Sequence, residues 1–227
     1  MIKKKKQGNL IIISGTSCAG KGTVIQELLK RNENLSISIS YTSRKMRPGE
    51  TDGIEYKFVS LNEFERKIEN EEFLEYVNYS ANYYGTGKKE IKELLDKGKD
   101  VILEIEVRGA QKVKEIFPET ILIFIMAPSM EEVKRRIKAR GKENNEQIIK
   151  RFQTAYNEIN EIPKYNYVVV NDEIKNAVDK IEAILLSEKC RVERIEEISV
   201  ESQEEIIHEF LMDKEFANSN IYENKLN

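Results

Sequence analysis

An apolar run leads directly into a glycine-rich turn in Leu10-Ile11-Ile12-Ile13-Ser14-Gly15-Thr16-Ser17-Cys18-Ala19-Gly20-Lys21-Gly22-Thr23. The run is branched and continuous, as in a strand that is covered on both faces. Residues 15–21 then fit the pattern G-x-x-x-x-G-K of a phosphate-binding P-loop. Glycines let the backbone curl, so that successive N–H groups point at one anion at a helix N-terminus. The predicted nucleotide-binding residues are Gly15, Thr16, Ser17, Cys18, Ala19, Gly20, Lys21, Gly22 and Thr23.

Two side chains of this loop have roles that follow from phosphate chemistry. The lysine of such a loop reaches the β- and γ-phosphates, and a hydroxyl coordinates Mg²⁺. Gly22 occupies the usual position of that hydroxyl, and Thr23 supplies it one residue later. We therefore expect Lys21 at the phosphates and Thr23 at the metal.

Strands and helices alternate along the rest of the chain. Continuous apolar runs recur in Val101–Leu103, Ile121–Ile125 and Tyr167–Val170, and helical patterns such as Ile91–Leu95 stand between them. Strand–helix alternation of this kind favours right-handed βαβ units. We predict an α/β fold with a parallel sheet covered by helices.

Three segments depart from this alternation. Ser36–Ser40 and Glu55–Ser60 predict strands of a small, half-exposed sheet inserted into the main fold. Residues 131–151 are basic and helical around the polar tip Gly141–Asn145, which indicates a helical hairpin that covers the site. From Arg191 to Asn227 the chain carries ten acidic and four basic residues, and we expect it to be partly helical or disordered.

The composition excludes several classes of protein. The 227 residues carry 37 basic and 40 acidic side chains, a net charge of −3, which argues against a nucleic-acid binder. No apolar run approaches the ~18 residues that cross a bilayer. A single histidine, His208, and two distant cysteines, Cys18 and Cys190, exclude a histidine metal cluster, a Ser-His-Asp triad and a disulfide framework. We expect a cytoplasmic protein with no nucleic-acid or membrane partner.

A second motif follows in Ser40-Tyr41-Thr42-Ser43-Arg44-Lys45-Met46-Arg47-Pro48-Gly49-Glu50-Thr51-Asp52-Gly53-Ile54-Glu55-Tyr56. Two arginines three residues apart can fork onto one phosphate, and a tyrosine hydroxyl adds a neutral donor. The segment resembles the acceptor-binding signature of guanylate kinases, a serine followed by T-x-R-x-x-R-x-G-E-x-x-G-x-x-Y, at every position. Together with the P-loop, this identifies the chain as a member of that family by resemblance.

The resemblance implies a P-loop kinase fold over residues 9–188, with a core of residues 9–34 and 98–188. A small mixed-sheet GMP-binding insert is expected at about 35–97 and a helical lid at about 131–151, followed by an acidic C-terminal extension, 189–227. The resemblance further implies ATP-dependent phosphorylation of GMP, and of dGMP, in purine metabolism. Mg²⁺ is the implied cofactor and ATP the co-substrate. A monomer and a homo-oligomer both remain open.

Nine residues stand at the GMP-binding positions of the family, which usually has aspartate at the last two: Ser40, Arg44, Arg47, Tyr56, Glu75, Tyr84, Thr86, Glu104 and Glu106. The two arginines and two tyrosines would hold the GMP phosphate. Guanine presents N1–H and its 2-amino group as adjacent donors, so the carboxylate of Glu75 is a natural partner, while Ser40 and Thr86 would face O6. Of the two strand-end glutamates, the first would lie near the guanine and Glu106 near the metal.

The resemblance also assigns residues to phosphoryl transfer. Lid arginines stabilise the charge that develops on the transferred group, and they match three positions in this chain. The expected catalytic residues are Lys21, Arg44, Arg136, Arg140 and Arg151. Asn171, which follows the strand Tyr167–Val170, matches a position near the adenine of ATP.

Cys18 departs from the family pattern, which has glycine in this part of the loop. If φ is positive there, a side chain costs on the order of 1 kcal/mol. That strain could weaken ATP binding without abolishing it.

Two other functions stay open at this point. One is a catalytically weak guanylate-kinase-like binding module, against which the intact Lys21 and the lid arginines speak. The other is a related P-loop kinase with a different phosphate acceptor, against which Glu75, Ser40 and Thr86 speak.

Overall fold

The computed structural model describes residues 2–4, 7–79, 81–139, 145–198 and 208. The chain divides into two units. The larger unit spans Lys6–Leu185, and the smaller one combines residues from both ends of the chain.

A parallel sheet of five strands forms the centre of the larger unit, in the order β10-β9-β2-β8-β3. The strands are β2 (Leu10–Gly15), β3 (Leu35–Ile37), β8 (Asp100–Glu104), β9 (Ile121–Met126) and β10 (Tyr167–Val170). All neighbours in this sheet pair in parallel. The predicted fold class is confirmed, and the loop after β2 opens at the carboxyl edge, where α/β sheets bind ligands.

Alternate side chains of β2 enter two separate apolar cores. Ile11 and Ile13 pack with α1 (Lys21–Arg31) and α7 (Ile174–Glu188), whereas Leu10 and Ile12 pack with α3 (Lys88–Asp96) and α4 (Val107–Ile116). Because both faces of the sheet are covered, the strand reads as one continuous apolar run. Within the described ranges, no helix has the length and apolar character needed to span a membrane.

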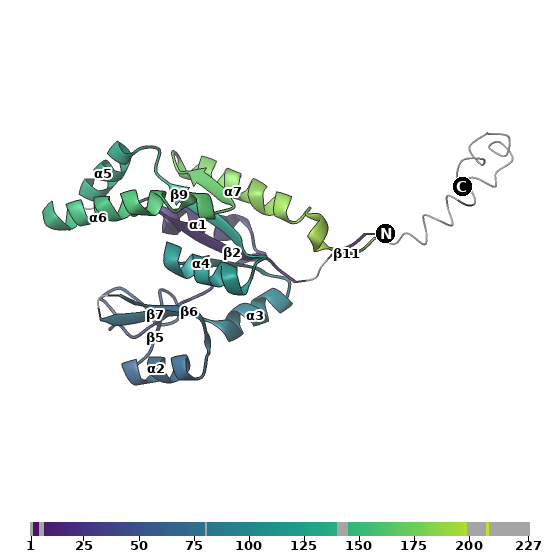
Figure 1. Cartoon of the computed structure of the whole chain (residues 1–227), viewed down its shortest axis with the longest axis horizontal. Coiled ribbons are helices and arrows are strands. Elements are labelled where there is room, and N and C mark those ends of the chain that lie inside the picture. Colours follow the sequence, from purple (N-terminus) through teal and green to yellow (C-terminus); the bar gives the residue numbers. More distant parts are fainter. Residues whose placement is uncertain (1, 5–6, 80, 140–144, 199–207, 209–227) are drawn as a thin grey trace. The chain divides into compact units, whose positions relative to one another are not determined.

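A second, mixed sheet has the order β5-β4-β7-β6. Its strands are β4 (Tyr41–Thr42), β5 (Lys57–Phe58), β6 (Phe73–Tyr79) and β7 (Asn82–Gly87). Helix α2 (Leu61–Glu69) packs on this sheet through Phe64, whose ring stacks on those of Phe73 and Tyr83. In Figure 1 this small sheet lies on one side of the large sheet, and α5 (Met130–Ala139) and α6 (Asn145–Ile159) lie on the other. Short 3₁₀ turns occupy Ile162–Lys164 and Val192–Arg194.

The prediction that placed the strand at Ser36–Ser40 in the small sheet is wrong. Residues 35–37 form β3, which pairs with β8 at the edge of the parallel sheet rather than in the small one. Leu35 and Ile37 pack on the core beside α1, while Ser36 between them is half-buried. An edge strand with one covered face thus alternates as an antiparallel strand does.

The smaller unit contains an antiparallel pair, β1 (Ile2–Lys4) with β11 (Ile195–Ile198). In the register of this pair, Ile2 lies opposite Ile198 and Lys3 opposite Glu197. The sequence indicated no strand in this part of the acidic extension. The helical and disordered segments predicted beyond residue 198 lie outside the described residues, apart from His208.

Candidate active site

The turn between β2 and α1 has the tight backbone of a phosphate-binding loop. Cys18 and Gly20 have φ values of 62° and 86°, in the left-handed region. A side chain at Gly20 would also collide with Asn171, because its Cβ would lie 2.6 Å from Nδ2 of that residue. The N–H of Ala19 donates to the carbonyl of Thr16 at 3.0 Å. The strain that we expected at Cys18 is therefore present, and it costs on the order of 1 kcal/mol.

The carbonyl oxygen of Ala19 ties this loop to two distant parts of the chain. It accepts hydrogen bonds from Nδ2 of Asn171 at 2.7 Å and from Nη1 of Arg136 at 3.3 Å. Arg136 also donates to the carbonyl of Asn171 at 3.0 Å and to Glu132 at 2.7 Å. Asn171 is only 3% exposed. Its side chain, which we expected near adenine, thus holds the loop in place.

A carboxylate from α6 reaches the same loop. Oε2 of Glu158 accepts the N–H of Ser17 at 3.0 Å, while the ammonium of Lys21 donates to the carbonyl of Gly15 at 2.8 Å. Burial raises the pKa of Glu158, and the Ser17 N–H and the charge of Lys21 oppose that rise. Sequence reasoning missed Glu158; its one signal is a position two helical turns after Arg151, on the same face.

Arg44 lies in a fork with Glu50. Its Nη1 and Nη2 donate to Oε2 and Oε1 of Glu50 at 2.9 and 2.8 Å, and Glu50 also accepts the N–H of Arg47 at 2.7 Å. The guanidinium lies 5.5 Å from the ring centre of Tyr56, whose ring is 5.7 Å from that of Tyr84. Glu50 raises the pKa of Arg44. Glu50, the glutamate of the acceptor motif, is a second residue that sequence reasoning did not single out.

Glu75 and Thr86 meet across the β6–β7 pair. Oγ1 of Thr86 donates to Oε1 of Glu75 at 2.7 Å, and the two residues are 7% and 1% exposed. Burial raises the pKa of the Glu75 carboxyl, while the Thr86 hydroxyl and the charge of Lys112 oppose that rise. The two base-recognition residues expected on these strands are therefore in direct contact.

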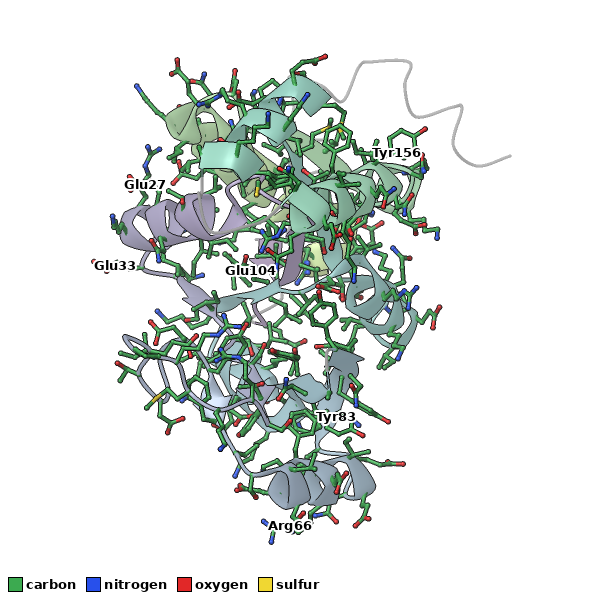
Figure 2. All side chains as sticks on the ribbon, turned by 90° about the vertical axis from the view of Figure 1, so that its left-hand side faces the viewer. Glu27, Glu33, Arg66, Tyr83, Glu104 and Tyr156 are labelled. Atoms are coloured by element: carbon green, nitrogen blue, oxygen red, sulfur yellow. The ribbon has the colours of Figure 1, made fainter. Side chains whose placement is uncertain are left out.

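A cavity of about 1100 Å³ lies beside the phosphate-binding loop. Its lining includes Gly15, Ser17, Lys21, Ser40, Tyr56, Glu104, Glu106, Arg151 and Glu158. Figure 2 shows Glu104 between the part of the unit that carries Tyr83 and the part that carries Tyr156. Of the residues expected to bind GMP, Arg44, Arg47, Glu75, Tyr84 and Thr86 do not line this cavity.

The two glutamates at the end of β8 have different neighbours. Oε2 of Glu104 lies 4.0 Å from the point that a Cβ on Gly22 would occupy. Burial raises the pKa of Glu104, and the charge of Lys21 opposes that rise. The charge of Glu106 instead adds to burial in raising the pKa of both Glu75 and Glu158. Glu104 thus faces the phosphate-binding loop, whereas Glu106 acts both on Glu75 and on Glu158, which contacts that loop.

The model of the family described as guanylate kinase matches residues 7–188. The chain belongs to the guanylate kinase family. A guanylate kinase of Clostridium tetani is 54% identical over 208 residues, which cover 92% of this chain and 100% of the relative. One from Clostridium perfringens is 51% identical over 212 residues, or 93% and 98% of the two chains. The crystal structure of guanylate kinase from Anaplasma phagocytophilum matches with a TM-score of 0.70 and 32% identity, over 94% of this chain and 98% of that one.

The family and the fold class predicted from the sequence are confirmed. This guanylate kinase is an enzyme that phosphorylates GMP with ATP. Neither a catalytically weak binding module nor a kinase with another acceptor is favoured by relatives of this identity and coverage.

Helices α5 and α6, which contain most of the segment expected to form the lid, pack around a small apolar cluster. Cys18 of the phosphate-binding loop packs against that cluster, so the side chain that strains the loop also connects it to α5 and α6. Arg136 reaches the loop from α5, and Arg151 lines the cavity from α6. Arg140 lies outside the described residues.

Asn171→Asp tests the anchor on the phosphate-binding loop. The substitution keeps the size of the side chain but sets a carboxylate against the carbonyl of Ala19, so the 2.7 Å hydrogen bond is lost. We expect the KM for ATP to rise about tenfold, since a lost buried hydrogen bond costs roughly 1–3 kcal/mol. The KM for GMP should stay within about twofold, and Asp172→Asn, at the exposed neighbour, should change neither. Equal changes in both KM values would contradict this role.

Glu75→Gln should stabilise the fold at neutral pH. Because burial raises the pKa of Glu75 in the folded state, the stability that this group contributes is full below its unfolded pKa, about 4.3, and is lost as the pH rises through the folded pKa. We expect the variant to gain about 1 kcal/mol in free energy of unfolding at pH 7 and nothing at pH 4, measured by urea denaturation.

Glu72→Gln is the matched control for that measurement. A hydrogen bond from Lys67 lowers the pKa of Glu72, so this carboxylate contributes stability above its unfolded pKa. Its substitution should bring no gain at pH 7. A loss of stability in Glu75→Gln at pH 7 would contradict the prediction.

Proposed function

We propose that residues 9–188 carry out the transfer at the 1100 Å³ cavity, with the ATP phosphates on the loop after β2. The GMP phosphate is assigned to Arg44, Arg47, Tyr56 and Tyr84, of which Tyr56 lines the cavity and lies beside Arg44. The observation that carries this proposal is the lining of the cavity. Ser17 and Lys21 line it from the phosphate-binding loop, and Ser40 and Tyr56 from the acceptor motif. Phosphoryl transfer needs positioning and charge neutralisation more than a general base, and the cavity brings these two groups of residues together.

On the ATP side, we assign Lys21 to the β- and γ-phosphates and the N–H groups at the start of α1 to the same anion. Arg151 lines the cavity from α6 and is proposed to neutralise charge on the transferred phosphoryl group. Arg136 donates to two backbone carbonyls at the phosphate-binding loop, so we assign it to positioning that loop. Arg140 stays a prediction from the sequence.

On the GMP side, we assign the phosphate to Arg44 and Arg47, with Tyr56 and Tyr84 as neutral donors. The fork between Arg44 and Glu50 leaves the guanidinium held in one orientation before GMP arrives, which lowers the cost of ordering it on binding. Ser40, Glu75 and Thr86 are proposed to recognise guanine. Adenine lacks the N1–H and 2-amino donors that a carboxylate accepts, so AMP should be rejected.

For Mg²⁺ we propose Thr23 and Glu104, in place of Glu106. Mg²⁺ takes oxygen ligands, keeps several waters and is bound through one or two carboxylates plus substrate phosphates. Thr23 is exposed at the start of α1, and the carboxylate of Glu104 lies beside Gly22, so their oxygens fit such a site. When bound, Mg²⁺ neutralises charge on the phosphates. No group of three carboxylate, thiol or imidazole side chains that could hold a metal unaided occurs in the described part of the chain.

A coupled assay of ADP formation with ATP and Mg²⁺ tests the proposed site. GMP and dGMP should support turnover, and AMP, UMP and the absence of an acceptor should not. Lys21→Ala should lower kcat by at least about 10²-fold, since it removes charge stabilisation of the transition state. Arg44→Ala should instead raise the KM for GMP. Full activity in Lys21→Ala would overturn the assignment of the ATP side.

Replacing each of Glu104 and Glu106 by glutamine in turn separates their roles. Glu104→Gln should raise the Mg²⁺ concentration for half-maximal rate about tenfold, since an ionised ligand is lost, with the KM for GMP nearly unchanged. Glu106→Gln should leave the Mg²⁺ dependence unchanged and alter the KM for GMP. If instead Glu106→Gln alters the Mg²⁺ dependence and Glu104→Gln does not, Glu106 is the metal ligand, as we expected from the sequence.

A further inference from the structure

Gly109 occupies an unusual place in α4. It is buried within the helix (Val107–Ile116), with no positive φ, so its backbone conformation would admit any residue. Glycine inside a helix is less favourable than alanine. The backbone therefore gives no reason for a glycine here, and the reason must lie in what surrounds it.

The space beside Gly109 is filled by the carboxylate of Glu75. A Cβ on Gly109 would lie 2.9 Å from Oε2 of Glu75 and 3.3 Å from its Cδ, with Cδ1 of Ile105 at 3.4 Å. The first distance is shorter than real Cβ contacts allow. The carboxylate thus lies directly against the backbone of α4, in room that exists only because residue 109 has no side chain.

The other oxygen of the same carboxylate is also fixed. Oε1 of Glu75 accepts the hydroxyl of Thr86 at 2.7 Å, and the side chain is 7% exposed. Thr86 on one side and α4 on the other therefore set the position and the plane of the carboxylate. A Cβ at residue 109 would push Oε2 away by a few tenths of an ångström and would turn the carboxylate about its hydrogen bond to Thr86.

We propose that Gly109 is a positioning residue for guanine recognition. It lets Glu75 present its carboxylate in the plane that accepts the adjacent N1–H and 2-amino donors of GMP. This inference rests on the proposed role of Glu75. The atom that a Cβ displaces is the far end of a flexible side chain, so Gly109→Ala changes the geometry of the base site at little cost in stability.

Steady-state kinetics of Gly109→Ala in the full chain tests the inference. We expect the KM for GMP to rise about tenfold, since misplacement of a positioned group by 1 Å costs about 10²-fold and the displacement here is smaller. The KM for ATP should stay within about twofold, and the melting temperature should not fall, because alanine is the better helix former. Arg108→Ala, at the exposed neighbour on α4, is the matched control and should change neither KM.

A double-mutant cycle separates positioning from simple packing. Glu75→Asp is shorter by one methylene and withdraws from the new Cβ, so Gly109→Ala should raise the KM for GMP less in that background than in the parent. A KM for GMP within twofold of the parent in Gly109→Ala overturns the inference. So does an equal effect in both backgrounds, or a lower melting temperature with both KM values raised together.

Glu75→Gln distinguishes this failure from a failure of the proposed function. If Glu75→Gln raises the KM for GMP and Gly109→Ala does not, only the role of Gly109 is wrong. If Glu75→Gln leaves the KM for GMP unchanged, the role of Glu75 in guanine recognition is wrong, and the inference falls with it.

Discussion

The shape of the phosphate-binding loop depends on one carbonyl oxygen, that of Ala19. Asn171, after β10, and Arg136, on α5, both donate to it, so the end of the sheet and helix α5 hold the same turn. Gly20 follows at a positive φ and leaves no room for a side chain beside Asn171. A loop whose N–H groups must converge on an anion has few hydrogen bonds of its own to define it. Here the conformation of the loop is fixed by hydrogen bonds from Asn171 and Arg136, which lie far away in the sequence.

The buried carboxylates of the site lower the stability of the fold, whereas the hydrogen bonds to Ala19 hold the phosphate-binding loop in place. Burial raises the pKa of Glu75, Glu104 and Glu158, which means that the folded protein would be more stable with these groups neutral. Their neighbours in the structure only partly offset this cost. Carboxylates with raised pKa values are typical of functional sites. Two of these three groups, Glu104 and Glu158, line the cavity, and Glu75 lies apart from it between β7 and α4.

Those features that are encoded within a short stretch of residues could be predicted from the sequence. The phosphate-binding loop and the acceptor motif each lie within a short stretch with fixed spacing, and the continuous apolar run at β2 indicated a sheet covered on both faces. The alternation at Ser36–Ser40 misled because an edge strand of a parallel sheet also has one open face. The contact of Glu158 with Ser17 spans 141 positions. The glycine at position 109 of helix α4 is explained by the side chain of Glu75 on β6, and neither contact leaves a periodic trace in the sequence.

The order of the strands has a consequence for how the protein is made. β2 is the first strand of the parallel sheet to be synthesised, yet both of its partners, β8 and β9, lie about a hundred residues later, and the hydrogen bond from Asn171 to Ala19 spans 152 positions. At roughly 5–20 residues per second, a ribosome needs on the order of ten to thirty seconds to cover that distance. The nascent phosphate-binding loop lacks its sheet partners for the first part of that time and its anchor, Asn171, for all of it. The part of the enzyme that is translated among the first must therefore be among the last to take its working shape, and a chain truncated before residue 171 should leave it unformed.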